Sequence, residues 1–128
     1  MANQMQKDEN QKILTFVSRT APYGSNRPQL CLDAALAAAI FDQDVNLVFL
    51  GDGVLQLIKN QSPQAISSKP LSSTLETLDL YGIKNIYIDQ DSMTKNHLLA
   101  EDLVLDGRPA GKEVLSELFE NSSAVFNL

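Results

Sequence analysis

The chain has 128 residues, of which 44% are hydrophobic and 20% are charged, and its formal net charge at pH 7 is −6. This length suits one domain with a hydrophobic core and is too short for two. The acidic balance, without any cluster of lysine or arginine, argues against direct contact with nucleic acid or an anionic membrane.

Residues 1–11 are polar and mixed in charge, so we expect a flexible tail there and no signal peptide. No apolar run has the roughly 18 residues that a membrane span needs. We therefore expect a cytoplasmic protein in which residues 12–128 form a single domain. The apolar, partly β-branched run at residues 13–17 is typical of a first strand.

An alanine-rich helix is predicted over residues 28–41, after a turn-rich loop at residues 18–27. Asn26 is placed to cap this helix, and Pro28 suits its first position. Asp33 is the only charged residue in the helix. A helix this apolar around its circumference is expected to be buried on more than one side.

Residues 45–60 read V-N-L-V-F-L-G-D-G-V-L-Q-L-I-K-N, a strand, a turn and a short helix. The strand at 45–50 is apolar on both faces, which predicts a central position in a parallel sheet. Gly51 allows a sharp exit from it, and Asp52 is a plausible N-cap of a helix at 54–58. This step lies at the carboxyl end of the strand, where open α/β sheets usually bind ligands and partners.

The helix at 54–58 is too apolar to have one face in water, so we expect that a partner chain covers it. Because burial of each such side chain is worth about 1.5–3 kcal/mol, a monomer that exposed several of them would be unfavourable. The predicted contact residues are Tyr23, Asp52, Gly53, Val54, Leu55, Leu57 and Ile58.

The second half of the chain continues the alternation of helices and strands. We predict a loop at 61–70, a helix at 71–80 that ends near Gly82, a strand at 83–88, a short helix at 92–99, a short strand or loop around 103–105, a helix at 109–120 and a strand at 123–128. This order predicts a three-layer α/β/α fold with a mostly parallel sheet and flavodoxin-like layering.

Cys31 is the only cysteine of the chain. It falls near the start of the alanine-rich helix and close to Arg27, and both features lower the pKa of a thiol, which would favour a reactive thiolate. The alternative is a small buried side chain, because free cysteine is among the most buried residue types. A single cysteine excludes an intramolecular disulfide and a multi-cysteine metal site.

Other candidate chemistry is weaker. The loop at 18–26 lies where flavodoxin-like proteins bind phosphate, but it lacks a glycine-rich phosphate motif, so a structured interaction loop is the better interpretation. Asp52, Asp89 and Asp91 suggest a Mg²⁺ or phospho-acceptor site, and we interpret them instead as solvated carboxylates at strand ends. His97 has no partner for acid–base catalysis by spacing and is expected at the surface. We predict neither a metal nor a cofactor.

Four stretches together resemble the DsrE/DsrF-like family, and within it the TusC/DsrF branch. They read I-L-T-F-V-S-R-T-A-P-Y-G-S at 13–25, L-C-L-D-A-A-L-A-A-A at 30–39, V-F-L-G-D-G-V-L-Q-L-I at 48–58 and L-Y-G-I-K-N-I-Y-I at 80–88. The ending V-F-N-L is also similar to the family. A-P-Y-G and D-G-V-x-Q-L are distinctive as a pair.

The resemblance implies a small α/β subunit of a cytoplasmic heterohexamer with TusB/DsrH-like and TusD/DsrE-like partners. Such a complex passes persulfide sulfur between carrier proteins, for 2-thiouridine formation at the tRNA wobble base or for sulfur oxidation. The family's carrier cysteine follows the third strand of the DsrE/TusD subunit, and residues 86–91 contain none here. The resemblance therefore implies a non-catalytic structural subunit. The alternative is a stand-alone sulfurtransferase or persulfide carrier that uses Cys31, and a flavodoxin-like cofactor binder is a third, weaker possibility.

Overall fold

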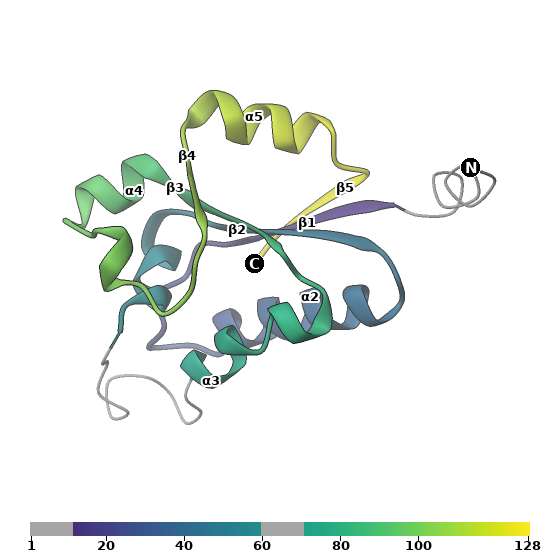
Figure 1. Ribbon diagram of the computed structural model, residues 1–128, viewed down its shortest axis with the longest axis horizontal. Coiled ribbons are helices and arrows are strands. Elements are labelled where there is room, and N and C mark those ends of the chain that lie inside the picture. The colour runs from purple at the N-terminus through teal and green to yellow at the C-terminus, as the bar shows by residue number, and fades with distance from the viewer. Residues whose placement is uncertain (1–11, 60–70) are drawn as a thin grey trace.

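The computed structural model describes residues 12–59 and 71–128 and contains a five-stranded, fully parallel sheet (Figure 1). The strand order is β4-β3-β2-β1-β5. The predicted tail at 1–11 and loop at 61–70 lie outside the described residues. The strands are β1 (Ile13–Ser18), β2 (Asp44–Phe49), β3 (Asn85–Asp89), β4 (Arg108–Ala110) and β5 (Ala124–Asn127).

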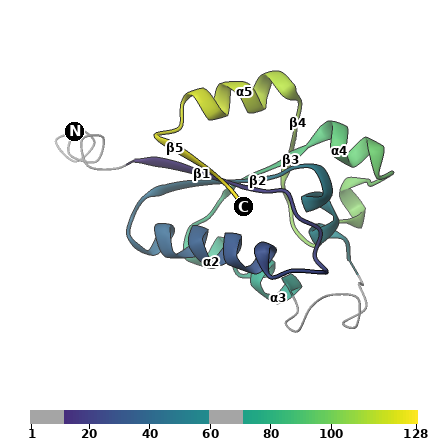
Figure 2. The ribbon, with the colours of Figure 1, turned by 180° about the vertical axis from the view of Figure 1, so that it is seen from behind.

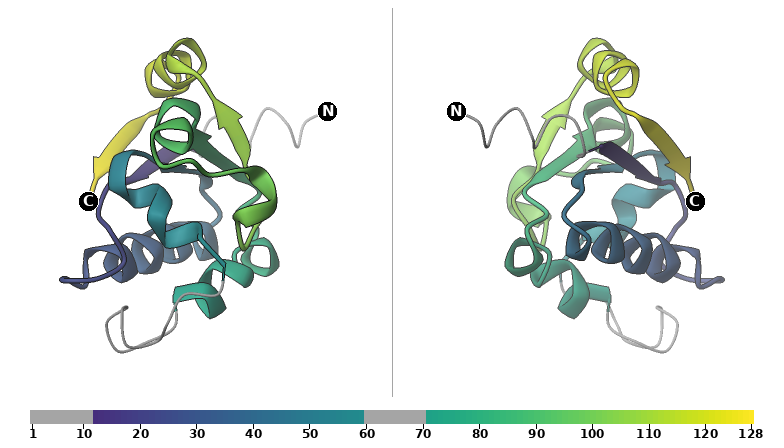
Figure 3. Two further views of the ribbon diagram at one scale, coloured as in Figure 1. Left: turned by 90° about the vertical axis from the view of Figure 1, so that its left-hand side faces the viewer. Right: turned by 90° about the vertical axis from the view of Figure 1, so that its right-hand side faces the viewer.

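Helices cover both faces of the sheet, as the three-layer prediction requires. In Figures 1 and 2, α2 and α3 lie on one side of the sheet and α5 lies on the other. The end-on views of Figure 3 show the same layers, with α5 across the sheet from α2 and α3. The helices are α2 (Arg27–Ile40), α3 (Leu71–Glu76), α4 (Gln90–Lys95) and α5 (Lys112–Glu120), and the 3₁₀ helices are η1 (Gly51–Leu57), η2 (Asp79–Tyr81) and η3 (Ala100–Asp102). Among the described residues, none of these helices has the length and hydrophobicity needed to cross a bilayer.

The strand predicted to be central, β2, lies in the middle of the sheet. Its residues from Val45 to Phe49 are all buried. Leu47 and Phe49 pack into the core beneath α2, whereas Val48 packs into the smaller core beneath α5. The apolar run therefore supplies both layers of the interior, which is why its two faces need cover.

Several boundaries differ from the sequence prediction. The helix expected at 109–120 begins only at Lys112, because residues 108–110 pair with β3 as the short edge strand β4. Pro109 is tolerated there since an edge strand has one unpaired side. The helix expected at 71–80 is divided into α3 and η2, and Gly82 ends η2 with a φ of 89°. Around 103–105, where a short strand or a loop was expected, Leu103 forms only an isolated antiparallel bridge with Ile58.

Within this chain helix α2 is buried on one side only, so its own fold does not supply the further cover that was expected. Pro28 lies in its first turn as predicted, but the Asn26 side chain makes no capping hydrogen bond. Cys31, Leu32 and Ala35 face the core. The outer face has no cover among the described residues, because the fold places only one helical layer on this side of the sheet.

Candidate functional site at the carboxyl edge of the sheet

The two distinctive sequence motifs meet at the carboxyl ends of β1 and β2. Gly51 adopts a φ of 57° and turns the chain out of β2. Gly53 then passes so close to β1 that a Cβ atom on it would lie 2.0 Å from the carbonyl oxygen of Ser18. The same oxygen accepts a hydrogen bond from the backbone N–H of Leu50 at 3.1 Å. The D-G-V turn is thus packed directly on the start of the loop that carries A-P-Y-G.

The side chain of Gln56 joins these two motifs through hydrogen bonds. Its side chain is 1% exposed, and Nε2 donates to the Ser18 hydroxyl at 2.7 Å and to the Thr20 carbonyl oxygen at 2.9 Å. No role was predicted for Gln56 from the sequence. The available signal was a single amide side chain within the otherwise apolar run 54–58, which suggests a buried polar group with a specific partner.

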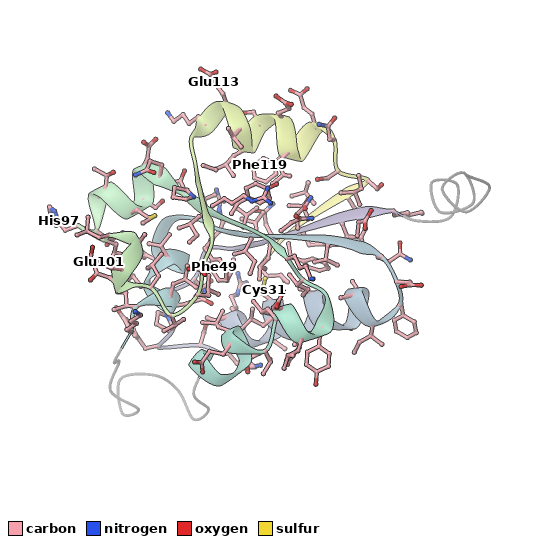
Figure 4. The ribbon with its side chains drawn as sticks, in the orientation of Figure 1. Cys31, Phe49, His97, Glu101, Glu113 and Phe119 are labelled. Carbon is pink, nitrogen blue, oxygen red and sulfur yellow. The ribbon has the colours of Figure 1, made fainter. Side chains whose placement is uncertain are left out.

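Cys31 lies beneath this junction, on the side of α2 that faces the sheet (Figure 4). It is fully buried, and burial raises the pKa of its thiol to about 11, although a hydrogen bond with Ser18 partly opposes that rise. The hypothesis that the helix N-terminus and Arg27 lower this pKa is therefore wrong, because desolvation is the larger effect. At neutral pH only about one thiol in ten thousand would be ionised.

The raised pKa of Cys31 predicts a specific alkaline sensitivity. The folded chain retains the thiol proton up to a pH of about 11, whereas the usual value is 9.0. Between these values the unfolded chain binds fewer protons than the folded chain, so the free energy of unfolding should fall as pH rises, by about 2–3 kcal/mol. Below that window the contribution is constant.

Urea unfolding of the parent and of Cys31→Ala across this pH window isolates the effect, because every other titrating group is common to both. We expect the free energy of unfolding of the parent to fall relative to that of Cys31→Ala as the pH rises. Parallel stability curves for the two proteins would contradict the raised pKa.

Asp89 is a structural carboxylate and not a solvated one, which corrects the expectation for this residue. It caps α4 by accepting hydrogen bonds from the backbone N–H of Ser92 at 3.0 Å and from the Ser92 hydroxyl. The Ser92 hydroxyl in turn accepts from the N–H of Gly51 at 2.9 Å. These bonds join the end of β3 to the turn after β2, so Asp89 stabilises the same edge of the sheet.

The other candidate residues, Asp52, Asp91 and His97, do not come together in a metal-binding or catalytic site. Asp52 and Asp91 are exposed, and His97 is exposed on the segment after α4, away from the sheet (Figure 4). Within residues 12–59 and 71–128, no three side chains of His, Cys, Asp or Glu are grouped so that they could hold a metal ion.

The predicted contact residues divide into buried and accessible ones. Val54 and Leu57 are 0% exposed, because η1 contacts α3, α4 and β3 of the same chain. The chain therefore supplies their cover, and the expectation that a partner does so is wrong for both. Asp52 is not the N-cap, since the helix begins at Gly51 after Leu50. Of the seven predicted contact residues, three are buried: Gly53, Val54 and Leu57. Leu55 and Ile58 are half-buried, and Tyr23 and Asp52 are exposed.

Comparison with known proteins gives a consistent assignment. The model of the DsrE/DsrF-like family matches residues 12–128. The chain is 33% identical to a protein named "Protein TusC homolog" from Vibrio parahaemolyticus, over 89% of this chain and 97% of the relative. It is 41% identical to the "Intracellular sulfur oxidation protein DsrF" of Allochromatium vinosum, over 73% of this chain and 68% of that protein.

The fold has a counterpart among solved structures. The crystal structure of the ychN protein from E. coli superposes with a TM-score of 0.77, at 19% identity, over 92% of this chain and 99% of that one. At this identity the likeness concerns the fold alone. Together with the sequence relatives and the family match, it leads to one conclusion. The chain belongs to the DsrE/DsrF-like family, in the branch of its TusC and DsrF relatives.

Proposed function

We propose that this chain is a non-catalytic subunit of a hetero-oligomeric sulfur-relay complex, and that related subunits carry the sulfur. The observation that supports this most strongly is the state of the only thiol. Cys31 is fully buried with a pKa of about 11, and β3 ends at Asp89 and is followed by Gln90 and Asp91, where the family's carrier subunit is expected to have its cysteine.

Persulfide transfer requires an accessible thiolate. The acceptor thiolate attacks the outer sulfur of the donor persulfide, a new S–S bond forms, and the donor sulfur leaves as a thiolate. A neutral thiol enclosed by α2 and the sheet can neither ionise readily nor reach the donor. The chain's role is then to complete the complex and to shape the surface on which carrier proteins dock.

We infer that the partners are TusB/DsrH-like and TusD/DsrE-like chains in the cytoplasm. The name of the DsrF relative supports sulfur oxidation as one outlet for the sulfur. The other outlet that we propose, tRNA wobble-base thiolation, rests on the family resemblance alone. Tyr23 and Asp52 are the accessible members of the predicted contact set, and both lie at the carboxyl edge fastened by Gln56. We propose that they contribute to the docking of carrier proteins or of neighbouring subunits.

Substitution of Cys31 tests this function. In a complex reconstituted with the TusB-like and TusD-like chains, Cys31→Ala should transfer sulfur at a rate within about twofold of the parent, because the thiol takes no part in the chemistry. Cys31→Ser places a more polar group at a fully buried position, so it should lose about 1–3 kcal/mol of stability without a specific loss of transfer.

The two substitutions distinguish a scaffold from a carrier. A carrier needs the thiolate itself, so both variants would abolish transfer equally in a folded, assembled complex. That outcome would support the alternative of a sulfurtransferase that uses Cys31.

A further inference from the structure

The largest collection of exposed apolar side chains lies on the helical layer formed by α2 and η2. Five large hydrophobic residues there are between 50% and 82% exposed, which includes the most exposed ones among the described residues. We refer to them as the α2–η2 patch: Leu30, Ile40, Phe41, Leu80 and Tyr81.

The patch faces away from the sheet. On α2, positions 30, 37 and 40 follow the helical repeat and lie opposite the buried positions Cys31 and Ala35. Phe41 continues the same stripe at the end of the helix. The 3₁₀ helix η2 contacts α2 in the same layer, so Leu80 and Tyr81 extend the stripe sideways.

The exposed area is close to what one side of a stable interface needs. If each of these large side chains has a total surface of about 200 Å², the five exposed fractions add up to about 600 Å² of accessible surface. A specific interface buries about 800 Å² on each partner, and its core is apolar while its rim is polar. The patch supplies the apolar core, and the residues around it supply the remainder.

The rim of the patch is acidic. Asp33 lies within the α2 stripe, Asp42 follows Phe41, and Glu76 and Asp79 precede Leu80; all four are exposed. Against these four carboxylates, two exposed cations, Arg27 and Lys84, are close in sequence to the patch. Two copies of this chain joined through the patch would bring these carboxylates together, and the formal charge of −6 adds to that repulsion. The expected partner is therefore a different chain.

We propose that the α2–η2 patch binds a non-identical protein subunit whose contact face has an apolar centre and lysine or arginine at its rim. This inference rests on the proposed function, in which the occupant is one of the related chains of the complex. It assigns subunit assembly to the α2 layer and leaves the carboxyl edge, with Tyr23 and Asp52, accessible to carrier proteins.

The test measures binding of the full-length chain to the TusB-like and TusD-like chains of its own genome by sedimentation and titration. The double variant Ile40→Ala/Phe41→Ala should weaken association by about 30-fold or more, since it removes the aromatic and aliphatic centre. Val114→Ala is the matched control: Val114 is 52% exposed on α5, on the opposite face of the sheet, and its loss should change affinity less than threefold.

Charge-reversal variants test whether the partner has a basic rim. Asp42→Lys/Asp79→Lys should weaken association, and it should also reduce the loss of affinity that added salt causes in the parent. Urea unfolding midpoints close to the parent's would show that each variant is folded.

The outcomes separate this inference from the proposed function. If the parent binds the related chains and the patch variants bind equally well, the inference is overturned and the function stands. Self-association of the parent through the patch would likewise overturn it, because the partner would then be a second copy. If the parent binds none of these chains, both the proposed function and the inference fail.

Discussion

Gly53→Ala is expected to destabilise the chain by about 3 kcal/mol or more. The added methyl group would lie 2.0 Å from the Ser18 carbonyl oxygen and 2.8 Å from its carbonyl carbon, and both are backbone atoms that no rotamer change can move. Overpacking usually costs 1–3 kcal/mol, and a clash with backbone belongs at the upper end. Chemical denaturation with urea would measure this as a lower midpoint.

Gly111→Ala is the matched control for this prediction. Gly111 is the N-cap of α5, where a Cβ atom has no neighbour within 4 Å and φ is −82°. We expect a change below about 1 kcal/mol, since only the weak preference for glycine over alanine at an N-cap is lost. Equal midpoints for Gly53→Ala and the parent would show that the turn after β2 does not pack on β1 as described.

Gln56→Ala is expected to cost about 2–4 kcal/mol. The substitution removes the hydrogen bonds from Nε2 to the Ser18 hydroxyl and to the Thr20 carbonyl oxygen, each worth about 1 kcal/mol, and it leaves a space in a fully buried position. It should also release the loop that carries Tyr23, which faster hydrogen exchange of residues 20–25 would report.

A double-mutant cycle with Ser18→Ala separates the hydrogen bond from general loss of packing. We expect a coupling of about 1 kcal/mol between the two positions, because their side chains are 2.7 Å apart and directly bonded. Strictly additive effects would mean that Gln56 does not hold the loop through Ser18.

The central features of the fold follow from residue patterns. The run at 45–50 indicates a strand buried on both faces, and β2 lies at the centre of the sheet, where helices cover both faces. Gly82 marks the end of a helix and adopts the left-handed conformation there. Strand β4 could not be predicted in this way, since Arg108, Pro109 and Ala110 become a strand only by pairing with β3.

The site was only partly accessible to sequence reasoning, because composition alone does not decide which apolar helix is covered. Val54 and Leu57 were expected to need a partner, yet α3, α4 and β3 enclose η1. Helix α2 was expected to be buried on several sides, yet Ile40 and Phe41 are exposed. The difference is one of position, because η1 packs against α3, α4 and β3 while α2 forms the outer layer on its side of the sheet.

The bonding at the carboxyl edge likewise depends on tertiary structure. Gln56 and Ser18 are 38 positions apart in the chain, and their hydrogen bond exists only because the turn at Gly51 folds η1 back over β1. Asp89 resembled a solvated carboxylate at a strand end, and its role became visible only with Ser92 and Gly51 beside it.

The most direct test of the central claim, that this chain takes part in a sulfur relay without carrying sulfur, is intact-protein mass spectrometry of the reconstituted complex. After incubation with a persulfide donor, the TusD-like chain should gain the mass of one sulfur atom, while this chain keeps its own mass because Cys31 is enclosed and protonated. A gain of one sulfur atom on Cys31 that disappears when an acceptor protein is added would contradict the account.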